Sequence, residues 1–255
     1  MLGLFKMKKI FICIIFCFLC SSQTPASINK IEAKYSNNMK TSTSSSEMRD
    51  YTYKATKELD NEQKVLLKEL ANSLLEKEQN LLYINQQLWD KYIISSKKST
   101  YDILHKQMGW IYQELAIGNL HSQALTRALT TYYLQKDSEI KPYEYLPKQL
   151  EECLQKANCE QDICKCFDIQ KNIYENKILV LLKSNKSKIT PSDYTKVLLT
   201  QQDWKNLVTN TKNSLFKIID NQKTEKPNQK KSQILFMLYQ DRCAELEDIN
   251  FIATP

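Results

Sequence analysis

Scarcity of glycine constrains the fold of this chain more than any other feature of its sequence. Its 255 residues include three glycines, Gly3, Gly109 and Gly118, and Gly3 lies in a segment that we expect to be removed. Glycine-rich phosphate loops, dinucleotide-binding turns, nucleophile elbows and most tight β-hairpins need glycine at set positions. The sequence therefore favours an all-α fold. Hydrophobic residues make up 42% of the chain, which is enough for a genuine core.

The N-terminal residues are typical of a secretory signal peptide. Three lysines without an acidic residue precede an unbroken apolar stretch, Ile10–Cys20, and a small polar segment follows it. A membrane-spanning helix needs about 20 apolar residues, so we expect a cleaved signal over residues 1–22 rather than an anchor. The mature protein should then be exported, to the periplasm or the extracellular space.

Removal of residues 1–22 changes both the charge and the cysteine count. The whole chain has 36 basic and 29 acidic side chains, and losing three lysines lowers its net charge from +7 to +4. Three of the eight cysteines leave with the same segment. The five that remain are Cys153, Cys159, Cys164, Cys166 and Cys243.

The rest of the chain divides into a polar leader and two helical regions. Residues 23–49 are rich in Ser, Thr and Asn, which indicates a flexible leader. Residues 50–140 form an N-terminal helical region, and residues 141–255 form a C-terminal region that contains the cysteines. We expect these two regions to pack together as one irregular helical bundle.

A long amphipathic helix is predicted over residues 50–94, which contain neither glycine nor proline. Leucines recur every seven residues from Leu67 to Leu88, and further apolar residues widen this stripe beyond a two-stranded coiled-coil seam. Such a helix would be about 65 Å long, too long to bury both ends. We expect its N-terminal end to project, with Tyr51 and Tyr53 as partner-binding candidates.

Later boundaries are marked by capping and breaking residues. A polar break is expected at Ser95–Thr100, and the helix that follows it should end or kink at Gly118. Thr190-Pro191-Ser192-Asp193 has the residue order of a helix start. Residues 223–233 indicate a linker, and a last amphipathic helix is predicted over 234–247.

The cysteine run from Cys153 to Cys166 predicts a disulfide-stapled helical hairpin, because cysteines of exported proteins are normally oxidised. Cys164 and Cys166 point to opposite sides of a helix, so one bridge should join Cys153 or Cys159 to one of them across a turn at Asn158. Cys243 can then bond another member of the cluster and leave about one free thiol. Zinc is the rival interpretation, which the oxidising compartment and the missing CxxC pair disfavour. No metal or cofactor is expected.

Positive charge concentrates in residues 171–234, where 13 lysines face five acidic residues. The chain has only three arginines, and none lies in this stretch. Nucleic-acid recognition relies on arginine, so we expect no nucleic-acid partner. Solvated helix faces account for most of these lysines, and an anionic membrane surface or an acidic protein is the ligand class that would suit them.

No catalytic residue is assigned, since His105 and His121 belong to no catalytic motif and the carboxylates have ordinary surface spacing. The sequence favours an exported, non-enzymatic interaction protein, such as an adhesin, an effector or a component of a secretion or pilus assembly. Its plan of signal peptide, long amphipathic helix and helical body is similar to that of minor pilus components of bacterial secretion systems. Two alternatives stay open: a carrier with an apolar cavity between helices, and a hydrolase with dispersed catalytic residues.

Overall fold

The computed structural model describes residues 26–106, 110–135 and 146–252. All regular elements within these ranges are helices, and no strand occurs in them, which confirms the all-α prediction. The predicted signal peptide at 1–22 lies outside the described residues. The helices, with one π-helical segment labelled η1, are α2 (Ala26–Thr41), α3 (Ser45–Ser73), α4 (Glu76–Ser96), η1 (Lys97–Tyr101), α5 (Asp102–Lys106), α6 (Trp110–Gln135), α7 (Lys148–Lys156), α8 (Glu160–Lys186), α9 (Pro191–Asn213), α10 (Leu215–Asn221) and α11 (Pro227–Ile252).

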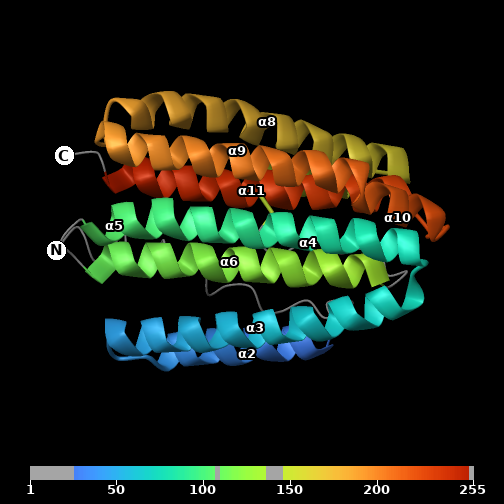
Figure 1. The fold of residues 1–255 in the computed structure, drawn as a ribbon, viewed down its shortest axis with the longest axis horizontal. Helices are drawn as coiled ribbons and strands as arrows, with labels where there is room; N and C mark the ends of the chain where they lie inside the picture. Colours follow the sequence, from blue (N-terminus) through green and yellow to red (C-terminus); the bar gives the residue numbers. More distant parts are fainter. Residues whose placement is uncertain (1–25, 107–109, 136–145, 253–255) are drawn as a thin grey trace.

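Figure 1 shows the long helices running side by side along the long axis of the molecule in layers. Helices α8, α9 and α11 form the upper part, α4 and α6 lie in the middle, and α2 and α3 lie at the lower edge. One large hydrophobic cluster runs from Ile28 in α2 to Ile249 in α11.

Helix α11 lies inside this bundle. Six consecutive side chains, from Ile234 to Tyr239, are buried, so the helix is enclosed on all its sides rather than on one face. It packs mainly on α8 and also on α6, α9 and α10. The helix begins at Pro227, so the linker predicted over residues 223–233 is wrong for residues 227–233, which are helical. That turn has no glycine, and Lys223 (φ 51°) and Lys226 (φ 54°) take the left-handed conformation in its place.

The prediction of a flexible leader over residues 23–49 is wrong for the described part of that segment. Helix α2 packs against α3, and Ile28, Ile31, Tyr35 and Met39 lie on its covered side. Successive members of this set are three or four positions apart, which is helical spacing. The abundant Ser, Thr and Asn residues between them hid the apolar face.

The single long helix predicted over residues 50–94 is also wrong, because the chain reverses at Leu74–Leu75 into an antiparallel helical hairpin (Figure 1). Both leucines are extended, with ψ near 150°. The Glu78 carboxylate accepts from the Leu75 N–H at 3.2 Å, and the Gln79 amide donates to the Leu74 carbonyl oxygen at 3.0 Å. Side chains of the next turn therefore satisfy the backbone groups that the break exposes.

As a result, the N-terminal end of α3 does not project. It is covered by α2 and α6, and Tyr51 is half-buried beside the small cluster formed by Tyr35, Met39 and Ala55. Tyr53 is exposed on the same helix.

Two further boundaries differ from the sequence-based prediction. The polar break expected at Ser95–Thr100 is instead the π-helical turn η1, through which the chain stays helical from α4 to α5. Gly118 neither ends nor kinks a helix but lies in the middle of α6. By contrast, the predicted start at Thr190 is confirmed: its side chain accepts from the Asp193 N–H, and Pro191 is the first residue of α9.

The position of Gly118 yields a test of the helical assignment. A Cβ atom built on Gly118 would meet nothing within 4 Å, and glycine in a helix interior is less stable than alanine by about 0.5–1 kcal/mol. We expect Gly118→Ala to raise the free energy of unfolding by about that amount in urea titration. The matched control Ala116→Gly, at a buried position of the same helix, should lower it. A destabilised Gly118→Ala variant would contradict a continuous α6.

Candidate functional site

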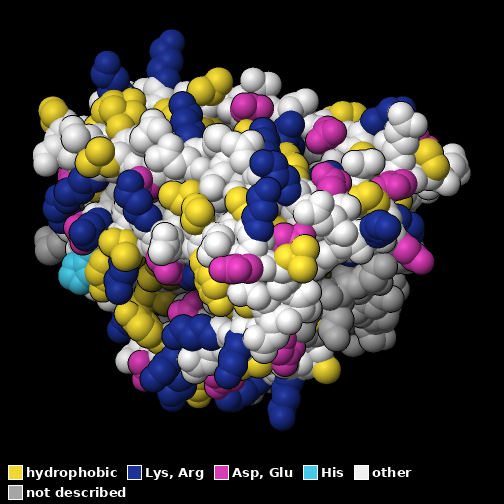
Figure 2. Space-filling view, turned by 45° about the vertical axis from the view of Figure 1, so that its right-hand side comes forward, with side chains coloured by type: hydrophobic (Ala, Val, Ile, Leu, Met, Phe, Trp, Pro, Cys, Tyr) yellow, Lys and Arg dark blue, Asp and Glu magenta, His cyan; other side chains and the backbone are white. Residues whose placement is uncertain are grey.

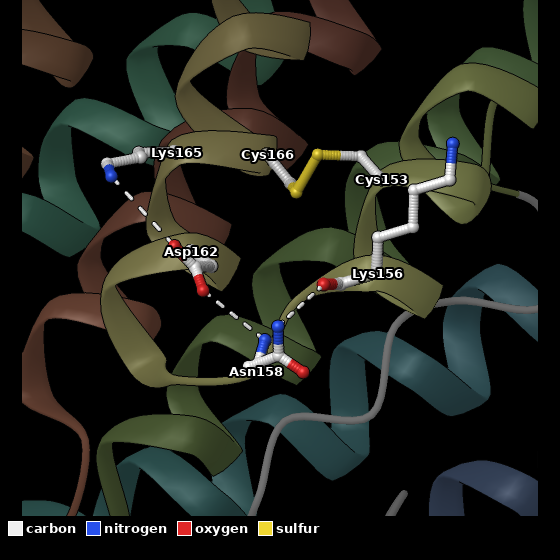
Figure 3. The surroundings of a disulfide bond; sticks show 6 residues. All are labelled: Cys153, Lys156, Asn158, Asp162, Lys165 and Cys166. Atoms are coloured by element: carbon white, nitrogen blue, oxygen red, sulfur yellow. Dashed lines mark hydrogen bonds and ion pairs between the residues drawn. A yellow bond between two sulfur atoms is a disulfide. The ribbon is translucent and has the colours of Figure 1, made fainter.

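One disulfide closes the turn between α7 and α8, as the sequence predicted, and the pair formed is Cys153–Cys166 (Figure 3). The Cα atoms are 5.7 Å apart. In the turn, the Asn158 N–H donates to Asp162 at 3.3 Å and the Asn158 amide donates to the Lys156 carbonyl oxygen at 3.3 Å. Closing such a short loop lowers the conformational entropy of the unfolded chain, which raises the free energy of unfolding by about 3 kcal/mol. The bridge therefore fixes α7 against α8.

The expected second bridge to Cys243 is absent among the described cysteines, which leaves Cys159, Cys164 and Cys243 as thiols. Cys243 on α11 lies near Tyr174 and Lys177 of α8. Tyr174 lies eight residues beyond Cys166, about 12 Å along the helix, and a disulfide needs Cα atoms within about 7 Å. Burial, with the nearby Glu247 carboxylate, raises the pKa of Cys243 to about 12, so this thiol is unreactive.

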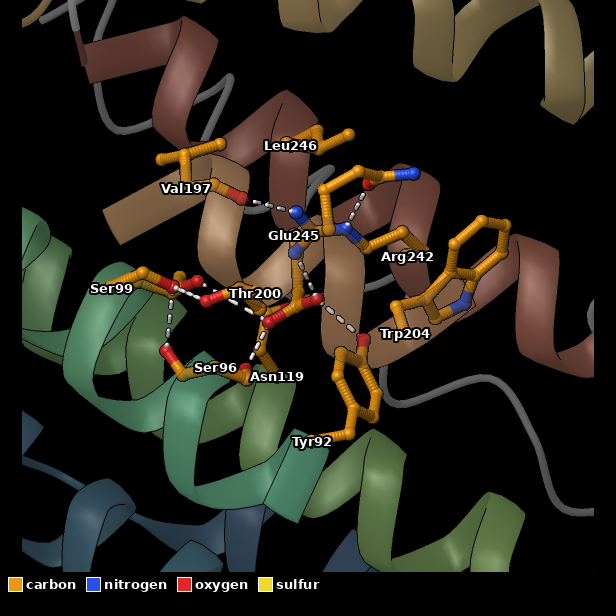
Figure 4. A network of polar contacts seen from close by, with 12 residues as sticks. Tyr92, Ser96, Ser99, Asn119, Val197, Thr200, Trp204, Arg242, Glu245 and Leu246 are labelled. Carbon is orange, nitrogen blue, oxygen red and sulfur yellow. Dashed lines mark hydrogen bonds and ion pairs between the residues drawn. The ribbon is translucent and has the colours of Figure 1, made fainter. Parts of the chain in front are cut away.

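The most extensive polar cluster in the described chain surrounds Arg242 and Glu245 of α11 (Figure 4). Arg242 Nη1 and Glu245 Oε2 are 2.9 Å apart, and both side chains are completely buried. Arg242 also donates through Nε to Gln201 at 2.9 Å and through Nη2 to the Val197 carbonyl oxygen at 3.2 Å. These contacts join α11 to α9.

The Glu245 carboxylate binds three hydroxyl groups from the other side of the cluster. Tyr92 donates to it at 2.6 Å and Thr100 at 3.3 Å, and Ser96 donates to the same oxygen as Thr100. Burial and the adjacent carboxylate raise the pKa of Tyr92 well above its usual value, which keeps the phenol protonated. Each charged or hydroxyl group in this set has a partner and none reaches solvent, so the cluster joins α11 to α4, η1 and α9 in the interior of the bundle.

Other carboxyl groups of α11 extend this row toward α6. Asp241 accepts from Ser122 at 2.8 Å, and Asp248 accepts from Asn119 at 2.8 Å. Burial raises the pKa of Asp241 to about 6, and burial together with Glu247 and Glu245 raises the pKa of Asp248 to about 7. These two carboxyl groups therefore take up protons far more readily in the folded chain than in the unfolded one.

The two histidines do not form a site. His121 stacks on Tyr35, with ring centroids 4.4 Å apart, and its Nε2 lies 3.2 Å from Glu32. His105 is exposed on α5 beside Tyr101. Among the described residues no three His, Cys, Asp or Glu side chains gather as metal ligands would. His121 thus serves the packing of α2 on α6.

Exposed aliphatic side chains are unusually frequent on the α8–α9 hairpin. Helix α8 packs on α11 and α9 packs on α4, while the two arms contact each other little. The exposed fractions in α8 are 57% for Ile169, 41% for Ile173 and 66% for Val180. The complete set is Ile169, Ile173, Leu179, Val180, Leu198 and Leu199.

Lysines accompany these apolar residues. Lys165 and Lys177 are exposed and pair with Asp162 and Glu247 respectively, whereas Lys183 and Lys186 are exposed and have no ion pair with a described carboxylate. Figure 2 shows hydrophobic and lysine side chains next to each other along the upper edge, where Figure 1 places α8. The candidate functional site is therefore this outer surface, which the sequence analysis located only as a lysine-rich region.

Comparisons with known protein families, with curated proteins and with solved structures find no match to this chain.

In the described ranges no helix combines the length and the apolar character that crossing a membrane requires.

The cysteine assignment predicts which thiols can be alkylated. When the unreduced protein is denatured, Cys159, Cys164 and Cys243 should react with iodoacetamide, and Cys153 and Cys166 should appear as one linked peptide in mass spectrometry. Prior reduction, as the control, should expose all five. Protection of Cys243 without reduction would reinstate a bridge from α11 to the hairpin.

The carboxyl group of Asp248 predicts how stability depends on pH. Its pKa is about 7 in the folded chain, against an ordinary value of 3.8. Its contribution to the free energy of unfolding is therefore fully present below about pH 4 and is lost as the pH rises through 7. Asp248→Asn keeps an acceptor for Asn119 without a charge. We expect this variant to gain about 1 kcal/mol over the parent at pH 8 and little at pH 4.5, by urea unfolding.

Asp162→Asn serves as the control with the opposite sign. The Asp162 pKa is lowered, chiefly by hydrogen bonds from Cys159 and Asn158, so this variant should gain no stability at pH 8. An equal effect of Asp248→Asn at both pH values would show that burial does not suppress the charge of Asp248.

Proposed function

We propose that this chain is an exported, non-enzymatic interaction protein and that its binding surface is the outer side of the α8–α9 hairpin. The observation that carries the proposal is the set of six exposed aliphatic side chains on this hairpin. Single exposed apolar residues are ordinary, but a row of exposed aliphatic side chains on one helix, such as Ile169, Ile173 and Val180 of α8, is typical of a binding surface.

Because α8 and α9 are antiparallel, the last two exposed aliphatic residues of α8 lie level along the helix axis with the two of α9. Leu179 and Val180 lie about 10 Å before the end of α8, and Leu198 and Leu199 lie about 11 Å after the start of α9. Val180 and Leu199 are 66% and 62% exposed at that level. A partner at this end of the molecule would therefore meet apolar side chains from both helices.

The interior of the bundle supports an interaction role in a second way. The Arg242–Glu245 cluster holds an acidic and a basic group close together, but both side chains are fully buried and hydrogen-bonded. A substrate could not reach them without opening the bundle. This favours binding through the surface over catalysis at this cluster.

Photo-crosslinking in the producing cells tests the proposal. A photoreactive amino acid at position 173 of the full chain should yield an adduct with its partner, protein or lipid, on irradiation, because Ile173 lies on the proposed surface. Position 65 is the matched control, since Val65 is 52% exposed on α3 at the opposite edge. Adducts from position 65 but not from 173 would overturn the assignment, and so would their absence from positions 169, 173, 180 and 199.

A further inference from the structure

We propose that the outer face of α8 docks on the surface of an anionic lipid bilayer; this inference rests on the proposed function and names the partner of the same hairpin. Three exposed side chains of α8 lie on one face of the helix. Ile169, Ile173 and Val180 are four and seven residues apart, and at 100° per residue they fall within about 40° of one another. They form one stripe about 16 Å long that faces away from the core.

The core-facing side of α8 is fully occupied by other residues. Its two aromatic side chains, Phe167 and Tyr174, both pack on Phe236 of α11. Ile178 and Leu181 are buried in the same core. Helix α8 therefore has two apolar faces, and α11 covers only one of them.

Lysines flank the uncovered stripe. By the same angular spacing, Lys165 and Lys183 border it on one side and Lys177 borders it on the other. Lys165 and Lys177 are paired with Asp162 and Glu247, so Lys183 and Lys186 supply the positive charge that no described carboxylate pairs with. Lys183 and Lys186 lie at the C-terminal end, where their positive charge also suits the negative end of the helix dipole. A helix surface with aliphatic side chains between lysines is typical of proteins that lie on anionic membranes.

The composition of this face distinguishes a bilayer from a protein partner. The centres of protein interfaces are enriched in Trp, Tyr, Phe, Met and Arg and depleted in Lys. The α8 stripe contains Ile and Val beside lysines, and the aromatic residues of the helix lie in the core. A symmetric contact with a second copy would bring the same lysines together, and like charges in contact are unfavourable.

The location of α8 also suits a broad, flat target. Figure 1 places this helix at the upper edge of the bundle, and Figure 2 shows lysine side chains standing out from that edge. The disulfide Cys153–Cys166 and the packing on α11 hold the helix in place. A bilayer can contact the ridge without any change in the fold, while the long lysine side chains reach the lipid headgroups.

Sedimentation with lipid vesicles tests the inference on the full chain. Wild-type protein should bind vesicles of 30% phosphatidylserine in phosphatidylcholine at low salt, and raising the salt to about 0.5 M should weaken binding. The double variant Lys183→Gln, Lys186→Gln should bind at least tenfold more weakly, since each lysine near an anionic surface contributes about fivefold. Ile173→Gln with Val180→Gln should also lose at least tenfold.

A control variant on α3 has the same chemistry on the opposite edge. Lys64, Val65 and Lys68 are exposed there, and their simultaneous replacement by Gln should change binding by less than twofold. The apolar segment Ile10–Cys20 is common to all variants, so binding through it is equal in each, and the differences between variants report on α8. Unchanged thermal melting should accompany every substitution, because all the sites are exposed.

A local probe provides an independent measurement. Brominated lipids should quench the fluorescence added by Ile173→Trp but not that added by Val65→Trp. Equal binding of the α8 variants and wild type, or equal binding to pure phosphatidylcholine, would overturn the inference. A protein adduct from position 173 without vesicle binding would reject the bilayer and retain the proposed function, whereas neither adduct nor vesicle binding would reject both.

Discussion

The buried ion pair between Arg242 and Glu245 determines how the upper part of the bundle is assembled. Both charges are removed from water, and such a pair is tolerated only when its remaining donors and acceptors are satisfied. Gln201 and Val197 of α9, together with Tyr92, Ser96 and Thr100 of α4 and η1, provide those partners. Two segments distant in sequence, α4–η1 and α9, must therefore meet at one point of α11. A different register of either of them would leave a buried charge unpaired, which costs several kcal/mol.

Because the polar groups of the interior are buried and paired, the groups that a partner can reach lie on the outside of the molecule. The buried side chains of Arg242 and Glu245 hold helices together, and burial also makes the thiol of Cys243 unreactive. Helix α8 differs, because α11 and the disulfide to α7 fix one side of it and leave the other uncovered. Rigid attachment on one side and exposed aliphatic residues on the other are compatible with a surface that binds without rearranging.

Local signals in the sequence were sufficient for part of the fold. Thr190 and Pro191 marked a helix start because capping depends on adjacent residues. A bridge across the Asn158 turn followed from the side-chain directions of a short hairpin, although four pairings stayed open and the structure forms Cys153–Cys166. The reversal at Leu74–Leu75 was missed because Glu78 and Gln79 stabilise it in the place of glycine or proline. The Arg242 cluster could not be predicted, since its members are separated by up to about 150 residues. Lysine density indicated the region of the candidate surface, but only the burial pattern of α8 identified its outer face.

The burial of α11 on every side also has a consequence for the time at which the protein can fold. This helix follows all the other described helices along the chain, and the face of α8 that packs on it stays uncovered until α11 is in place. During synthesis, or during passage through a translocation channel from the N-terminus, the preceding helices cannot complete their packing. The native core therefore cannot close before the last described helix has been synthesised.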